Sequence, residues 1–276
     1  MTFPDPPAAD DHQGAGPGRA TLTPDAPVLG RRLLTAEIWV VFALSLGASG
    51  VSALLQLIAS LTASKSLSRQ QALLVGSLAP GRPWIDLMYQ LFNIAVALAP
   101  VALVAYLLLR SGESLATLGV DRRRPTQDAV RGALLAAVIG GAGLLLYLGA
   151  YHAGANLTVV PANLPAVWWR IPVLLLAAAQ NGVLEEVLVA GYLLHRLSQL
   201  GWRPGHALTV SALLRGSYHL YQGFGGFAGN VAMGLIFGRL YQRWGRATPL
   251  VIAHTLIDGV TFVGYTLLHG HVAWLP

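Results

Sequence analysis

Runs of apolar residues long enough to cross a membrane are the feature that most constrains this sequence. Several of them reach the roughly 20 residues that an α-helix needs to span a hydrocarbon layer about 30 Å thick. Charged residues make up only 11% of the chain, whereas they make up about 25% of an ordinary soluble domain. The sequence therefore predicts an all-α fold, a polytopic bundle of transmembrane helices with about seven to eight spans.

The same runs give approximate positions for the spans. A short run at Leu73–Leu78 is expected to form an extra half-span or an interfacial segment. Most arginines fall on one side of the resulting topology, and the positive-inside rule makes that side cytoplasmic. We therefore expect a multi-pass protein of the cytoplasmic membrane, surrounded by the lipid bilayer, with its N-terminus in the cytoplasm. The predicted spans are Ala36–Ala63, Pro83–Leu109, Asp128–Tyr151, Trp168–Leu197, His206–Tyr221, Phe227–Trp244 and Thr248–Leu268.

Composition divides the chain into three regions. Residues 1–30 are rich in Pro, Ala, Gly and Asp and cannot bury enough apolar area to offset the entropy of ordering, so we expect a disordered cytoplasmic tail. Residues 31–160 are expected to form the N-terminal transmembrane helices. Residues 165–270 hold the polar residues that fall inside predicted spans, and we expect them to form the helical core that carries the function.

Composition excludes cysteine-dependent chemistry and argues against nucleic-acid binding. The chain has no cysteine, so it cannot use a disulfide framework, a thiolate zinc site or a cysteine nucleophile. Its net charge is +6, but the arginines lie at the ends of apolar runs and form no stripe interleaved with aromatic residues. We therefore expect no nucleic-acid partner.

Ionisable residues inside the last predicted spans are the strongest indication of a functional site. A charged group within a span costs several kcal/mol on most scales, so it usually faces a partner or a cavity. Glu185 and Glu186 lie in one such span. Adjacent helical residues point about 100° apart, so the two carboxylates are not expected to share one role.

Two later spans each carry a pair of polar residues at a spacing of four. Arg215 and His219 form one pair, and His254 and Asp258 form the other. Residues four apart lie on the same face of a helix. Asn230, in the span between them, is a supporting candidate that also fits a role in helix packing.

These residue types allow two kinds of hydrolytic chemistry. Glu185 beside His219 fits a pair that deprotonates a water, and His254 fits a donor to the negative charge that develops on a peptide carbonyl. Glu185, His219 and His254 also fit a hydrolytic zinc site. The sequence leaves open whether the cofactor is zinc or none. A purely structural ion pair with Arg215 is the alternative for both Glu185 and Glu186.

The three motifs together resemble those of the CPBP family, the type II CAAX prenyl endopeptidases and bacteriocin-processing (Abi) proteins, whose members are described as intramembrane metalloproteases. The family pattern is Glu-Glu-x-x-x-Arg, then Phe-x-x-x-His, then His-x-x-x-Asn or Asp, and the resemblance covers roughly Trp168 to Leu268. It implies that Glu185 activates water with His219 as its partner. It also implies that His254 and Asp258 stabilise the oxyanion.

The sequence departs from the family pattern at two positions. Ala190 stands where the pattern has arginine, and Arg215 stands where it has phenylalanine. Our hypothesis is that the changes compensate, because Arg215, one turn before His219, returns a positive charge to the neighbourhood of Glu186.

The resulting expectation is an intramembrane endopeptidase whose partner is a membrane-anchored peptide or protein substrate. The alternative is a non-catalytic membrane scaffold or immunity-like protein that binds a partner through the same polar cavity. A small proton-coupled transporter is a third reading, but the sequence shows no inverted half-repeat.

Overall fold

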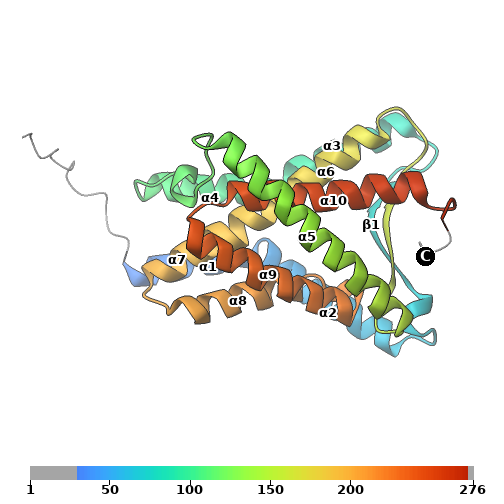
Figure 1. The fold of residues 1–276 in the computed structure, drawn as a ribbon, viewed down its shortest axis with the longest axis horizontal. Helices are drawn as coiled ribbons and strands as arrows, with labels where there is room; N and C mark the ends of the chain where they lie inside the picture. The colour runs from blue at the N-terminus through green and yellow to red at the C-terminus, as the bar shows by residue number, and fades with distance from the viewer. Residues whose placement is uncertain (1–29, 273–276) are drawn as a thin grey trace, which may run out of the picture.

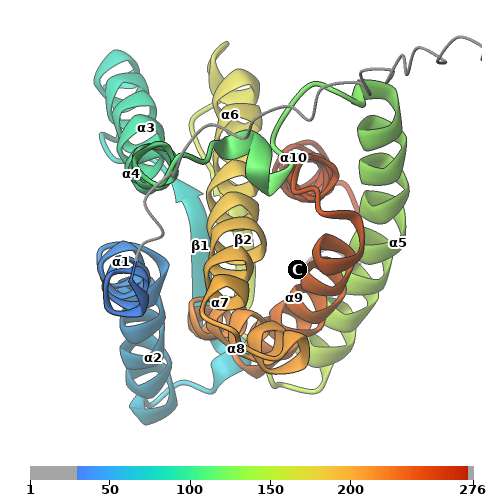
Figure 2. The same ribbon diagram turned by 90° about the vertical axis from the view of Figure 1, so that its left-hand side faces the viewer.

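The computed structural model describes residues 30–272, and these residues form a helical bundle with one small sheet (Figures 1 and 2). The predicted all-α class is confirmed. The predicted tail, residues 1–30, lies outside the described residues except for Gly30. The helices are α1 (Arg31–Ala43), α2 (Leu46–Thr62), α3 (Pro83–Ala97), α4 (Ala99–Arg110), α5 (Pro125–His152), α6 (Arg170–Glu185), α7 (Leu194–Gln199), α8 (Pro204–Ser217), α9 (Phe224–Trp244) and α10 (Thr248–Leu268).

Fewer helices qualify as membrane spans than the sequence suggests. Within residues 30–272, four are long and apolar enough: Pro83–Arg110, Pro125–His152, Arg170–Gln199 and Thr248–Leu268. The pair α1 and α2 makes a fifth if it counts as one span, although it bends by 46°. The number of about seven to eight spans is therefore not confirmed.

The two predicted spans that do not qualify are helical but unsuited to crossing alone. α8 has 14 residues and is therefore about 21 Å long, shorter than a hydrocarbon layer of about 30 Å. α9 has 21 residues, but glycines recur along it and its last turns carry Arg239 and Arg243. Both helices pack against one another and against the apolar spans.

Residues 73–76 of the short apolar run Leu73–Leu78 lie in a strand, so the run does not form a half-span. Strand β1 (Gln71–Gly76) pairs in parallel with β2 (Thr158–Asn163). A six-residue helix would leave most of its backbone groups unpaired, whereas a strand satisfies them against a neighbour. The parallel connection requires a long crossover, which here consists of α3, α4 and α5 (Figure 2).

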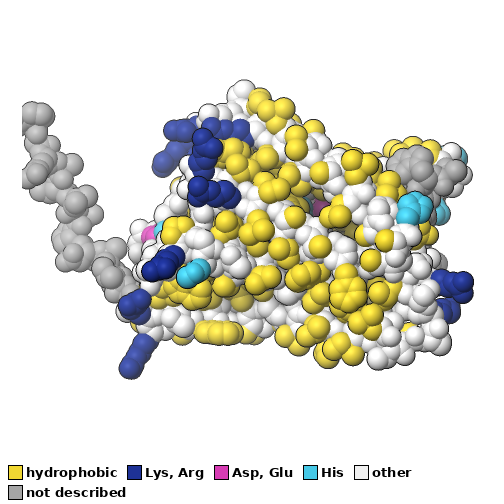
Figure 3. Space-filling view, turned by 60° about the horizontal axis from the view of Figure 1, so that its bottom comes forward, with side chains coloured by type: hydrophobic (Ala, Val, Ile, Leu, Met, Phe, Trp, Pro, Cys, Tyr) yellow, Lys and Arg dark blue, Asp and Glu magenta, His cyan; other side chains and the backbone are white. Residues whose placement is uncertain are grey.

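Apolar side chains dominate the outer surface between two ends that carry the basic residues (Figure 3). Trp39, Leu145 and Val260 are each more than 70% exposed. Exposure of this kind over many large side chains is unfavourable in water and is expected of a surface that contacts lipid. The structure is that of a multi-pass membrane protein.

Close approach of α10 to α6 holds the site together, and Gly182 permits it. A Cβ at Gly182 would lie 2.6 Å from Thr255 Oγ1 and 3.0 Å from the Val251 carbonyl oxygen. We expect Gly182→Ala to lower the free energy of unfolding by about 1–3 kcal/mol, because the added methyl overpacks this contact.

Chemical unfolding of the solubilised protein would measure this effect. Gly149→Ala is the matched control, since Gly149 lies in helix α5 with open space around its Cβ position. Replacing an exposed helical glycine with alanine favours the helix by up to about 1 kcal/mol. Equal effects of the two substitutions would contradict the proposed close packing at Gly182.

Candidate active site

The two adjacent glutamates lie where the regular helix α6 changes geometry. Glu185 is the last residue of α6, and Glu186–Leu193 forms a π-helical segment that continues into α7. Such segments are rare and frequently occur at functional sites. Glu185 retains 8% exposure and lines a cavity, whereas Glu186 is fully buried. The two carboxylates thus have different environments, as their angular separation predicts.

Arg215 of α8 binds both glutamates. Its Nη2 donates to Glu185 Oε2 at 3.1 Å and also bonds Glu186 Oε1, while Nη1 donates to Glu186 Oε2 at 3.4 Å. Arg215 is 1% exposed, so this pairing compensates charges that water does not reach. The hypothesis of compensating changes requires Arg215 to lie beside Glu186, and it does. Ala190, which stands where the pattern of the similar family has arginine, is buried.

His254 and Asp258 join the cluster from α10. His254 Nδ1 lies 2.7 Å from Glu186 Oε1 and 3.2 Å from Arg215 Nη2, and its Nε2 lies 3.7 Å from Asp258 Oδ1. Since Glu186 is a carboxylate, Nδ1 is the natural donor in that contact. Three helices thus meet through the side chains of Glu186, Arg215 and His254.

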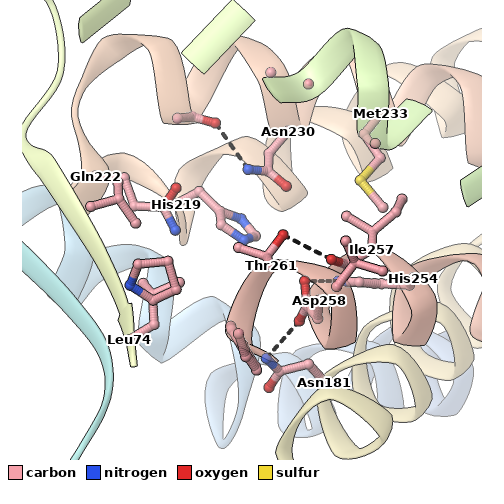
Figure 4. A pocket seen from close by; sticks show the side chains of 18 of the residues that line it. Leu74, Asn181, His219, Gln222, Asn230, Met233, His254, Ile257, Asp258 and Thr261 are labelled. Atoms are coloured by element: carbon pink, nitrogen blue, oxygen red, sulfur yellow. Dashed lines mark hydrogen bonds and ion pairs between the residues drawn. The ribbon is translucent and has the colours of Figure 1, made fainter. Parts of the chain in front are cut away.

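Asn181 is a site residue that the motif reasoning did not select. Its Nδ2 donates to Asp258 Oδ2 at 2.9 Å (Figure 4). It precedes Glu185 by four residues and therefore lies on the same face of α6, which is the sequence signal that identifies it. Asn181 fixes the orientation of the Asp258 carboxylate between α6 and α10.

One oxygen of the Glu185 carboxylate accepts hydrogen bonds from the protein, and the other accepts none among the described residues. Oε2 accepts hydrogen bonds from the Tyr218 hydroxyl at 2.8 Å and from Arg215. No side chain or backbone group among residues 30–272 donates to Oε1, and Oε1 is not among the fully enclosed polar atoms. Glu185 therefore offers one carboxylate oxygen to a molecule in the cavity.

His219 lies beyond the helix that was expected to carry it. α8 ends at Ser217, so His219 does not share a helical face with Arg215. Its ring folds back instead, and Nδ1 lies 3.0 Å from the Arg215 carbonyl oxygen. A carbonyl oxygen only accepts hydrogen bonds, so Nδ1 carries the proton and Nε2 of the neutral ring is left as an acceptor.

One cavity of about 1310 Å³ brings these groups to a common space. Glu185, His219, His254 and Asp258 all line it, and Asn230 lies on its wall near His219 (Figure 4). Asn230 donates to the Gly226 carbonyl oxygen of its own helix at 3.0 Å, so its amide oxygen remains available. The predicted polar residues from α6, α9, α10 and the turn after α8 thus surround one volume.

The zinc alternative does not fit this arrangement. Among residues 30–272, no three His, Asp or Glu side chains are grouped as a metal site. The set suggested for zinc was Glu185, His219 and His254, but His254 faces Glu186 and Arg215 through Nδ1. A guanidinium beside the two carboxylates disfavours a second cation there.

A second ionic cluster, only partly buried, lies away from the cavity, where Glu113 follows α4. Arg196 Nη1 and His195 Nε2 each lie 2.6 Å from a Glu113 carboxylate oxygen. Burial raises the pKa of Glu113, but the contacts with His195, Arg196 and the Ser111 hydroxyl outweigh it and hold the pKa below its usual value. The cluster ties the loop after α4 to α7 and thereby anchors the far end of the helix that carries Glu185.

Residues 167–260 match the protein-family model described as type II CAAX prenyl endopeptidase Rce1-like. The matched segment begins just before α6 and ends inside α10, so it includes both glutamates and the polar residues of α8 and α10. No curated protein and no solved structure matches the chain.

Proposed function

Since the match of residues 167–260 to the Rce1-like model supports membership of the CPBP family, we propose that this protein is an intramembrane endopeptidase. It hydrolyses a peptide bond of a membrane-associated peptide or protein. The family match supports a CAAX-type intramembrane protease. The observation that carries the finer proposal is the open Oε1 of Glu185 in a cavity that also contains His219.

In the proposed mechanism, Glu185 and His219 hold a water between them. Glu185 Oε1 takes a proton as the water oxygen attacks the peptide carbonyl carbon, and His219 Nε2 orients the water by accepting its second hydrogen. His254 lies on the same wall with its Nδ1–H donating to Glu186, and in its imidazolium form it also donates through Nε2–H to the oxyanion as the carbonyl bond opens. The proton on Glu185 then passes to the departing amine nitrogen, which completes hydrolysis.

The remaining groups of the cluster position these residues. Arg215 and Tyr218 hold Glu185 Oε2, which directs Oε1 towards the cavity. Asp258, held by Asn181, sets the orientation of His254 from its other side. Asn230 supports the wall next to His219. We also propose that the protein resides in the cytoplasmic membrane with its N-terminus in the cytoplasm, as the arginine distribution indicates.

A non-catalytic role as a membrane scaffold or immunity-like binding protein is the second candidate. The observation that favours it is the bond from Arg215 to Glu185, because a cation beside a carboxylate weakens it as a base. Both candidates use the same cavity, so a measurement of turnover separates them.

Comparison of peptide termini in cell membranes tests the proposal. Cells carry either the wild-type protein or Glu185→Gln at equal expression, and new or lost termini near membrane anchors are scored by mass spectrometry. We expect at least one terminus to depend on Glu185, because the amide retains the side-chain volume but cannot act as a base. Identical termini in both samples would favour the scaffold.

Tyr218→Phe tests the positioning of Glu185. The substitution removes the hydroxyl that donates to Oε2 at 2.8 Å and changes little else in volume. We expect turnover to fall roughly tenfold with little change in KM, since a hydrogen bond to a charged group contributes about 1.5–3 kcal/mol and Arg215 still holds the same oxygen. An unchanged kcat in reconstituted vesicles would show that Tyr218 does not position the carboxylate.

A further inference from the structure

A second pocket lies beside the last turns of α10, apart from the cavity that contains the proposed catalytic residues. It has a volume of about 160 Å³, and the end of β2, the start of α6 and the end of α10 form its wall. Tyr265 lines both spaces, so the pocket and the cavity are neighbours. None of the residues given a role in hydrolysis lines the pocket, so the proposed function does not account for it.

Most polar side chains of this pocket are hydrogen-bond donors without partners. Within residues 30–272, Arg170 makes no ion pair and no side-chain hydrogen bond, and the same holds for the side chains of Asn163, Tyr265 and His269. Each of these groups carries an N–H or O–H that can donate. No aspartate or glutamate of the described residues lines the pocket. The wall therefore offers several donors and a positive charge without a counter-charge.

The pocket combines buried apolar residues with polar residues that are accessible from outside. Ala162 and Leu164 are 8% and 7% exposed, whereas Asn163 and His269 are exposed. Arg170 is half-buried. A guanidinium that has lost part of its water and has no carboxylate beside it gains from binding an anion. The pocket is therefore suited to an anion that enters from outside the protein.

The size of the pocket limits what this anion can be. A volume of about 160 Å³ corresponds to roughly five water molecules at about 30 Å³ each, and most small-molecule sites are larger, at roughly 300–1,000 Å³. A polypeptide segment or a nucleotide is therefore too large, whereas a single phosphate group fits. The planar guanidinium of arginine matches two phosphate oxygens, which leaves the other oxygens for the amide, hydroxyl and imidazole donors.

Two tryptophans indicate that the pocket lies at the level of lipid headgroups. Trp84 and Trp168 are 66% and 73% exposed, and their ring centroids lie 6.2 Å apart. Tryptophans of membrane proteins are enriched at the interface between hydrocarbon and water. Arg170 follows Trp168 by two residues and begins the apolar span Arg170–Gln199, at the end of the molecule where α10 finishes (right in Figure 1). The phosphate groups of a bilayer lie in this interfacial layer.

We propose that this pocket binds a phosphate group, and that the phosphate belongs to a phospholipid of the surrounding bilayer. Arg170 binds two of its oxygens, and Asn163 and His269 donate to the others. Leu267, which follows Thr266 of the pocket, is 58% exposed and gives the acyl chains an apolar surface. The bound lipid joins β2, α6 and α10 at the end of the bundle. The inference does not depend on hydrolysis, because binding uses none of the proposed catalytic residues.

Binding of three probes to the delipidated full-length protein in an uncharged detergent tests this inference. Native mass spectrometry measures the binding of phosphatidylglycerol and of diacylglycerol with the same acyl chains, and titration calorimetry measures the binding of inorganic phosphate. Arg170→Gln removes the guanidinium from the pocket. Arg82→Gln is the matched control, since Arg82 is exposed, lies two residues from the other tryptophan, Trp84, and does not line the pocket.

We expect the wild type to bind phosphatidylglycerol at least about tenfold more tightly than diacylglycerol, because only the first lipid carries a phosphate. Arg170→Gln is expected to remove most of this difference, while Arg82→Gln changes it by less than about twofold, as loss of an exposed charge does. Arg170→Lys restores part of the affinity, since lysine keeps the charge but cannot bind two oxygens in the same plane. Equal binding of the two lipids by the wild type would overturn the inference. Equal losses in Arg170→Gln and Arg82→Gln would indicate a general basic surface and overturn it as well.

Inorganic phosphate distinguishes the two sources of the anion. We expect it to bind more weakly than phosphatidylglycerol, because it has no acyl chains to bury. Binding of inorganic phosphate that depends on Arg170, without binding of phosphatidylglycerol, would support the phosphate site and overturn its assignment to a lipid.

Chemical unfolding checks that the variants remain folded. Arg170 has no side-chain partner among the described residues, so Arg170→Gln is expected to unfold like the wild type. His269→Phe is a second, independent variant that keeps an aromatic ring beside Tyr265, 4.7 Å away between ring centroids, but removes both ring nitrogens. We expect it to weaken phosphatidylglycerol binding by a smaller factor than Arg170→Gln. Unchanged binding in both folded variants would overturn the inference.

Discussion

We expect purified Glu185→Gln to hydrolyse its substrate about 10²- to 10⁴-fold more slowly than the wild type, while its unfolding transition changes little. This is the expected size of a general-base contribution. The amide oxygen still accepts from Tyr218 and Arg215, which are the partners of Glu185 Oε2. Single-turnover kinetics in vesicles, beside chemical unfolding of the same samples, would measure both quantities.

Glu186→Gln is the matched control for this experiment. It makes the same chemical change one residue along, at a fully buried position that does not line the cavity. Because Glu186 bonds both Arg215 and His254, we expect a larger loss of stability and a smaller loss of turnover than in Glu185→Gln. Equal losses of turnover would show that the two carboxylates do not have separate roles.

Arg215→Met is expected to lower the free energy of unfolding by about 3–5 kcal/mol. The substitution leaves two carboxylates in the bundle without their guanidinium partner, and removing one member of a buried ion pair typically costs this much. Arg239→Met is the control, since Arg239 is an exposed arginine of α9. Its unfolding free energy is expected to change by no more than about 0.5 kcal/mol.

A double-mutant cycle separates charge from packing in this cluster. Glu186→Gln combined with Arg215→Met removes a buried charge together with its partner, so we expect the pair to cost less than the sum of the single changes. Coupling between contacting charged residues typically amounts to about 0.5–3 kcal/mol. Strict additivity would mean that Arg215 stabilises the bundle through its hydrocarbon chain and its packing on Phe237 rather than through the glutamates.

Sequence patterns predicted the long apolar helices well because length and composition determine them directly. The last of them, Thr248–Leu268, has the bounds that its apolar run gives. Arg215 meets both glutamates as the departures from the family pattern suggest. The helix bounds depend on the local sequence, and the Arg215 contact depends on pairing of opposite charges. Residue type and spacing are enough to predict both.

The features that sequence missed depend on contacts between distant segments. The strand Gln71–Gly76 exists because Thr158–Asn163 lies beside it, and a short apolar run gives no sign of that partner. His219 was placed on a helix that ends two residues earlier. Asn181 contributes through Asp258, which follows it by 77 positions.

The meeting of α6, α8 and α10 at one guanidinium has a consequence for how the protein is made. Glu185 and Glu186 leave the ribosome before Arg215, and His254 follows only with α10. Until α8 docks, two carboxylates lie in the nascent bundle without their cation, and until α10 inserts, His254 and Asp258 are missing from the cluster. In a newly made chain, the polar cluster is therefore complete only after α10 has been inserted into the membrane.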